Sequence, residues 1–137
     1  MKNILIFILF VLIQNTAYSQ FYFGADRIET KNQILKQETD VNITTDSAKN
    51  IQFICKEKET AFKILFNNDG LAYTNVLIPF NEKALNKWIK GFNDQYIVKS
   101  EKEWVHYSSG YVFEFKLVYH ENLFMIIGIQ KSISKAD

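Results

Sequence analysis

Hydrophobic and polar positions along this chain follow two repeats, one typical of helices and one typical of strands. Apolar residues at helical spacing form a broad stripe over 81–92, after Asn81, a preferred helix-capping residue. Gly91 and Asn93 mark the expected end of this helix. A sparser stripe predicts an earlier helix over 26–37, in which Asp26 is the cap and Glu29 its capping-box partner.

Strands are expected after each helix, because every second residue of the remaining segments is apolar. The first group of three strands covers 51–55, 62–66 and 71–78, with a hairpin turn at 67–70. The second group covers 96–107, 111–119 and 123–129, and its first member contains a candidate turn at 101–102. The polar segment 36–50 predicts a loop.

The resulting order is helix, three strands, helix, three strands. Most connections are tight turns, which join antiparallel strands, whereas parallel strands need long crossovers. The sequence therefore predicts an α+β fold in which two helices pack on one face of a mainly antiparallel sheet. The order also suggests that one helix-and-sheet unit occurs twice, near 24–80 and near 81–131.

The beginning of the chain has the layout of a secretory signal peptide. Lys2 precedes an uninterrupted apolar run over 4–13, and small side chains stand at Ala17 and Ser19. This arrangement predicts cleavage between Ser19 and Gln20. The alternative is a retained membrane anchor, but an apolar run of ten residues is shorter than the about 20 that span a bilayer.

Cleavage at this point divides the chain into a signal peptide, 1–19, and a single α+β domain, 20–137. The product is expected to be exported to the periplasm or to the medium, without a stable membrane anchor. The ending of the signal peptide resembles those of Gram-negative gliding bacteria.

The step from Phe23 to Gly24 into a helix, followed by helix–strand repeats, resembles small exported bacterial α+β proteins, many of unknown function. The layout also resembles the helix-plus-sheet repeat of the β-lactamase-inhibitor-protein-like fold, which small outer-membrane assembly lipoproteins share. The resemblance is one of pattern across the predicted domain, without a shared motif, so it implies no functional residues. Unlike those lipoproteins, the chain has no Cys at a lipid-attachment position, since its single Cys is Cys55.

Composition narrows the classes of partner. The chain has 137 residues, with 16 Lys+Arg against 15 Asp+Glu, and 47% of its residues are hydrophobic. This near-neutral balance gives no electrostatic attraction to nucleic acid, so no nucleic-acid partner is expected. The apolar content is too high for a disordered chain. One Cys permits neither an internal disulfide nor a cysteine-cluster metal site.

Candidate catalytic and metal-ligating residues are few. His106 and His120 have no ligand-type spacing, so neither a metal nor a cofactor is expected. Cys55 and His106 are the only Cys–His combination, but Cys55 alternates with apolar strand residues and is expected in the core. Ser108 and Ser109 lie in a turn rather than in a nucleophile elbow. We therefore predict no catalytic residue, while a catalytic pair of carboxylates stays open because the sequence gives no separations.

Aromatic side chains are the feature that most suggests binding, since they make up 15% of the chain. The candidate binding residues lie in the last strands and are Trp104, His106, Tyr107 and Tyr111. Alternation places Trp104 and His106 on one face and Tyr107 on the other. An exposed Trp and Tyr face would be a binding surface. The alternative is core packing with cross-strand aromatic pairs.

Three functions are compatible with these observations. The favoured one is a non-catalytic binding or interaction domain of the cell envelope, whose partner is an envelope or extracellular protein or a small ligand. The second is a small secreted hydrolase that uses His106 or His120 with a nearby carboxylate. The third is a structural envelope component that self-associates through an exposed strand edge.

Overall fold

The computed structural model describes residues 21–133, so the predicted signal peptide and its cleavage site lie outside the described residues. The described helices are α2 (Arg27–Gln37) and α3 (Glu82–Gln95). The strands of the first half are β1 (Thr44–Thr45), β2 (Ile51–Cys55), β3 (Thr60–Phe66) and β4 (Ala72–Pro79). Those of the second half are β5 (Ile97–Ser100), β6 (Glu103–Ser108), β7 (Tyr111–His120) and β8 (Leu123–Ser132).

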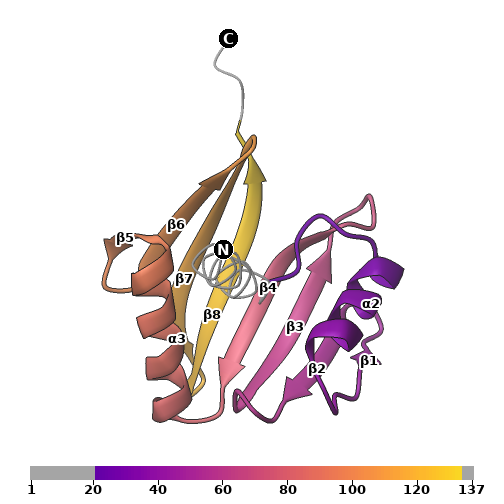
Figure 1. The fold of residues 1–137 in the computed structure, drawn as a ribbon, viewed down its shortest axis with the longest axis horizontal. Coiled ribbons are helices and arrows are strands. Elements are labelled where there is room, and N and C mark those ends of the chain that lie inside the picture. Colours follow the sequence, from indigo (N-terminus) through magenta and orange to yellow (C-terminus); the bar gives the residue numbers. More distant parts are fainter. Residues whose placement is uncertain (1–20, 134–137) are drawn as a thin grey trace, which may run out of the picture.

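All of these strands belong to one antiparallel sheet, in the order β1-β2-β3-β4-β8-β7-β6-β5. Each helix precedes a meander of four strands, and the two meanders meet where β4 pairs with β8 (Figure 1). The predicted α+β class with an antiparallel sheet is confirmed. The strand order is symmetric about the junction of β4 and β8, as a repeated helix-and-sheet unit requires.

Each half contains one strand more than the hydrophobic pattern predicted. β1 consists of Thr44 and Thr45, both exposed, so it carries no apolar alternation and was expected to be loop. The segment 96–107, counted as one strand, forms β5 and β6, which pair with each other across a turn at 101–102. Short edge strands of this kind contribute little to the core, which is why they leave little trace in the sequence.

Both predicted helix caps are present. The side chain of Asp26 accepts a hydrogen bond from the backbone N–H of Glu29 at 2.8 Å. The side chain of Asn81 accepts one from the backbone N–H of Ala84 at 2.9 Å. These bonds satisfy N–H groups that the first turn of a helix leaves without an internal partner, so they define where α2 and α3 begin.

The end of α3 lies beyond the predicted one. Gly91 is inside the helix, which continues to Gln95. Phe92, which is 2% exposed, packs its ring 5.2 Å from that of Trp104. Tertiary packing of this turn overrides the helix-breaking tendency of Gly91. Neither α2 nor α3 is long and apolar enough to cross a membrane, as judged on the described residues.

The two helices cover the same face of the sheet, α2 over the first half and α3 over the second (Figure 1). The core lies between them and the sheet, and its strand residues alternate as a half-buried sheet requires. The most buried of them are Ile51, Phe53, Phe62, Ile64, Leu77, Trp104, Phe115 and Ile126. The opposite face of the sheet, here called the open face, carries the intervening residues.

The segment before α2 is part of this core. Tyr22 is 1% exposed. Its backbone N–H donates to Oδ1 of Asn75 at 2.8 Å, and its carbonyl accepts from Nδ2 of Asn75 at 2.6 Å. The N–H of Gly24 donates to the carbonyl of Ala72 at 2.7 Å. The first described residues are therefore fixed against β4 by main-chain and side-chain hydrogen bonds.

Candidate binding surface

The four predicted binding residues do not form one surface. Trp104 is 1% exposed, and its ring N–H donates to Oδ1 of Asn93 at 2.8 Å, so it belongs to the core. The predicted division of faces is confirmed, because Trp104 and His106 lie on the helix-covered face and Tyr107 on the open face. Tyr107 and Tyr111 are both largely exposed, next to the turn that joins β6 to β7.

His106 lines a small aromatic cavity of about 250 Å³ on the helix-covered side. The ring of His106 lies 5.4 Å from that of Tyr96 and 6.0 Å from that of Phe113. The rest of the lining consists of Phe21, Phe23, Phe115 and the candidate nucleophile Ser108. The described lining residues include no carboxylate. The cavity therefore brings His106 and Ser108 to one site without the carboxylate that the hydrolase hypothesis requires.

The other candidate catalytic groups lie far apart. Cys55 is in β2 and His106 in β6, five strand spacings away in the sheet, or about 24 Å at the usual spacing. The Cys55 thiol is buried and donates to Oε2 of Glu38 at 3.2 Å. Burial raises the pKa of this thiol, and the Glu38 carboxylate raises it further, which keeps the nucleophilic thiolate unpopulated.

His120 is exposed at the end of β7. Its Nε2 lies 3.6 Å from Oε1 of Glu121, its neighbour in the chain, and neither lines a described cavity. No group of three or more His, Cys, Asp or Glu within 21–133 is placed to hold a metal ion. The described geometry thus gives the hydrolase hypothesis no support.

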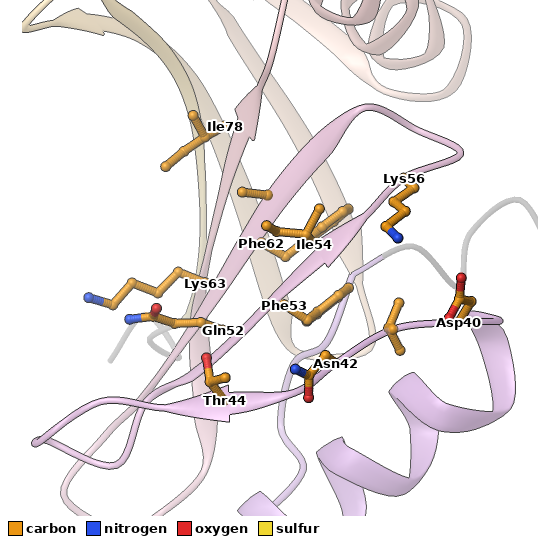
Figure 2. A pocket seen from close by; sticks show the side chains of 12 residues that line it. Asp40, Asn42, Thr44, Gln52, Phe53, Ile54, Lys56, Phe62, Lys63 and Ile78 are labelled. Atoms are coloured by element: carbon orange, nitrogen blue, oxygen red, sulfur yellow. The ribbon is translucent and has the colours of Figure 1, made fainter.

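A larger hollow, of about 660 Å³, lies beside β2, next to the short edge strand β1 (Figure 2). Its apolar lining includes Ile54, Ala61 and Ile78, whose side chains belong to the open face. The segment 40–44, which connects α2 to β1, forms the other wall. Ile54 is 51% exposed, although it lies within β2. An apolar side chain this exposed, in a concave site, is typical of a binding surface.

The hollow exists because β1 is short. Thr44 and Thr45 pair with Gln52 and Ile51, and the ladder then stops. Upstream, Asp40 adopts a left-handed backbone conformation, with φ of 58°, that turns the chain as it leaves α2. The segment between these points passes β2 without joining the sheet.

Polar side chains surround the apolar lining. Gln52 and Lys63 lie at one end of the hollow, and Lys56 and Asp40 lie at the other (Figure 2). Lys63 forms an ion pair with Oδ2 of Asp46 at 3.2 Å. The side chains of Asn42, Gln52 and Lys56, by contrast, form no hydrogen bond or ion pair with another described residue. They are available to a bound molecule.

Asp46 fixes the wall of the hollow by holding the turn between β1 and β2. One oxygen of its carboxylate accepts from the backbone N–H groups of Ala48 and Asn50, each at 2.9 Å. The bond from Asn50 and the nearby Lys63 hold the pKa of Asp46 below its usual value. The turn therefore depends on a carboxylate that stays ionised at neutral pH.

Sequence reasoning missed this hollow. The available signal was alternation in β2, which places Gln52 and Ile54 on the face opposite the buried Phe53 and Cys55. Ile54 differs from other exposed isoleucines, such as Ile97, in that it lies in a concave site, and alternation alone does not reveal this. The polar segment 36–50 predicts a loop, and a loop prediction does not say which strand Asn42 lies beside.

The apolar surface continues from the hollow across the open face. Val76 and Ile78 of β4 and Ile127 and Ile129 of β8 are half-buried there, although none faces the helix-covered core. The central strands are therefore apolar on both faces.

Comparison of this chain with protein-family models, with curated proteins and with solved structures finds no match.

Proposed function

We propose that this chain is an exported, non-catalytic binding domain of the cell envelope that recognises a protein partner at the hollow beside β2. The observation that carries the proposal is the half-exposed Ile54, set in an apolar lining and surrounded by polar side chains, of which those of Asn42 and Gln52 bond to no other described residue. An apolar centre within a polar rim is the usual anatomy of a protein interface.

A protein partner is favoured over a small ligand by the surroundings of the hollow. The apolar surface extends from Ile78 to Ile127 and Ile129 on β8, beyond the hollow itself. A partner that covers both areas is larger than a small molecule. Single exposed apolar residues need no explanation, whereas a continuous apolar area marks an interaction site.

Export is proposed on the signal-peptide layout of residues 1–19. Cleavage before Gln20 leaves intact the segment that holds Tyr22 and Gly24 against β4. The single, buried Cys55 also fits an oxidising compartment, since it is shielded from disulfide exchange.

The test is cross-linking of the tagged full-length chain in its native cells, followed by mass spectrometry of its N-terminus and of attached proteins. Wild type is compared with Ile54→Glu, which places a charge in the hollow. The matched control is Ile97→Glu, because Ile97 is also an exposed isoleucine in a strand and lies in β5, at the far edge of the sheet from β2.

We expect an N-terminus at Gln20 and one dominant partner that Ile54→Glu loses and Ile97→Glu retains. Equal recovery by both variants would place the interaction elsewhere on the molecule. Recovery of the chain alone would contradict a protein-binding function. Recovery of a second copy of the chain would favour self-association, and an N-terminus at Met1 would contradict export by cleavage.

A further inference from the structure

We infer that the hollow binds an extended segment of the partner protein, which pairs through its backbone with the outer edge of β2 at Phe53–Cys55. This inference rests on the proposed function and specifies the chemistry of the partner. The observation that carries it is the interrupted pairing along the outer edge of β2. This is a feature of the backbone and is independent of the apolar surface.

The two edges of β2 differ. Along its inner edge, all five residues of β2 pair with β3, from Ile51 with Ile64 to Cys55 with Thr60. Along its outer edge, β1 pairs with Gln52 and Ile51 alone. The remaining outer edge, about 10 Å long at the usual rise per residue, has no ladder partner among the described residues. In such an edge, alternate residues present N–H and C=O groups outward.

The connection from α2 passes this edge without pairing with it. If the register of β1 continued, Asn42 would lie opposite Ile54 and Ile43 opposite Phe53. Ile43 packs against the core and Asn42 lines the hollow, the sides of the sheet that a continued β1 would also give them. The segment nevertheless stands off from β2, because Asn42 and Ile54 line the same hollow without pairing. The space that a continued β1 would fill is therefore part of the hollow, and an added strand would occupy it.

The side chains around the edge match an extended peptide. Ile54 stands at the centre of the unpaired edge, next to Ala61 and Ile78. A strand paired with β2 would place one of its side chains directly over Ile54, at the distance of a cross-strand pair. We therefore expect an aliphatic residue at that position of the peptide.

Side-chain amides at the hollow add a second means of holding a backbone. Asn42 and Gln52 line it, and neither bonds to another described residue. The protein already uses an amide in this way, because Asn75 bonds both the N–H and the carbonyl of Tyr22. Main-chain pairing combined with pockets for alternate side chains is the recognition mode of strand addition.

The experiment uses random peptides of about ten residues, long enough to span the edge, displayed on phage and selected against the full chain. Enriched peptides are synthesised in two versions that are N-methylated at alternate residues, in one version at odd and in the other at even positions. N-methylation removes backbone donors along one edge of an extended peptide and leaves its side chains unchanged. Each version is titrated into wild type, Ile54→Glu and Ile97→Glu.

We expect one methylated version to bind at least about tenfold more weakly than the parent peptide and the other to bind nearly as well, since only one edge pairs with β2. The Ile54→Glu variant should no longer bind the parent peptide, whereas the Ile97→Glu variant should bind it as wild type does. Hydrogen exchange should show added protection at Ile54, because the bond from the N–H of Asp46 to the carbonyl of Asn50 sets the alternation by which Ile54 points its N–H to the outer edge.

Equal tolerance of both methylated versions would overturn strand addition, and so would the absence of any enriched peptide. Peptides that bind wild type and Ile54→Glu alike would overturn the location. The proposed function is tested separately, by native cross-linking. If cross-linking yields a partner that depends on Ile54 while the methylated peptides show no alternation, the proposal of a binding domain is retained. The proposal of an extended segment is then rejected.

Discussion

Asn75 shows how one buried side chain organises the centre of this molecule. It is fully buried, and its amide bonds both backbone groups of Tyr22. Asn75→Ala should lower the free energy of unfolding by about 2–5 kcal/mol, because two buried backbone groups each lose a partner. Urea unfolding measures this, with the exposed Asn86→Ala as the control, which should change stability by less than about 0.5 kcal/mol. Equal effects of the two variants would contradict the role given to Asn75.

Trp104 tests whether the aromatic cluster is core or binding surface. Its ring is buried against Phe92 and bonded to Asn93. Trp104→Ala should lower the free energy of unfolding by about 3–5 kcal/mol, the usual range for a buried large aromatic residue. Tyr107→Ala, at a largely exposed position of the same strand, should have little effect. A Trp104→Ala protein as stable as wild type would contradict the assignment of Trp104 to the core.

The Cys55 thiol and the Tyr22 hydroxyl make the free energy of unfolding fall at alkaline pH. Burial raises the pKa of both groups, so each holds its proton more tightly in the folded chain than in the unfolded one. The stability linked to them is complete at neutral pH. It is lost as the pH rises above the unfolded values, about 8.5 for Cys and about 10 for Tyr.

Urea unfolding of wild type should therefore show a free energy of unfolding that falls above pH about 8.5. In Cys55→Ala the decline should begin later, near the ionisation of Tyr22 in the unfolded chain. The comparison uses the slope against pH, because the smaller side chain lowers stability at every pH. A wild-type profile that is flat or rises to pH about 10 would contradict the assignment.

At the scale of elements, the turn between β1 and β2 depends on Asp46, which bonds Ala48 and Asn50. Asp46→Ala should speed amide exchange at both residues and along β1, since only two residue pairs hold β1 to the sheet. The control is Asp69→Ala in the hairpin between β3 and β4, where Asn67 rather than Asp69 accepts the turn bonds. Unchanged exchange in Asp46→Ala would show that packing alone holds this turn.

Elements that bury a regular apolar face were predictable from sequence, whereas those that bury none were not. The stripe of α3 and the alternation of β7 each carry enough apolar residues to define an element. β1 has two exposed threonines and is held by its turn. The hollow depends on where the segment 40–44 leaves β2, and no residue pattern encodes that path. The aromatic cluster was visible in sequence, but alternation alone did not tell which face the helices cover.

At the scale of the whole molecule, two similar halves share one sheet and one core. Their junction on the sheet consists of four residue pairs between β4 and β8. The segment that contains Tyr22 adds a second link, because it contacts Asn75 of β4, and the adjacent Phe21 packs on Phe92 and Phe115 of the second half. The two faces of the sheet differ. Both helices cover one face, and the proposed binding site lies on the side of the other, open face.

The measurement that tests the central claim most directly is the equilibrium affinity of the purified chain for the partner recovered by cross-linking, determined for wild type, Ile54→Glu and Ile97→Glu. An unpaired charge buried in the hollow should weaken binding at least about tenfold in Ile54→Glu. Ile97→Glu should bind within about twofold of wild type, because Ile97 lies on the opposite edge of the sheet. Three equal affinities would contradict the assignment of the hollow beside β2 as the binding site.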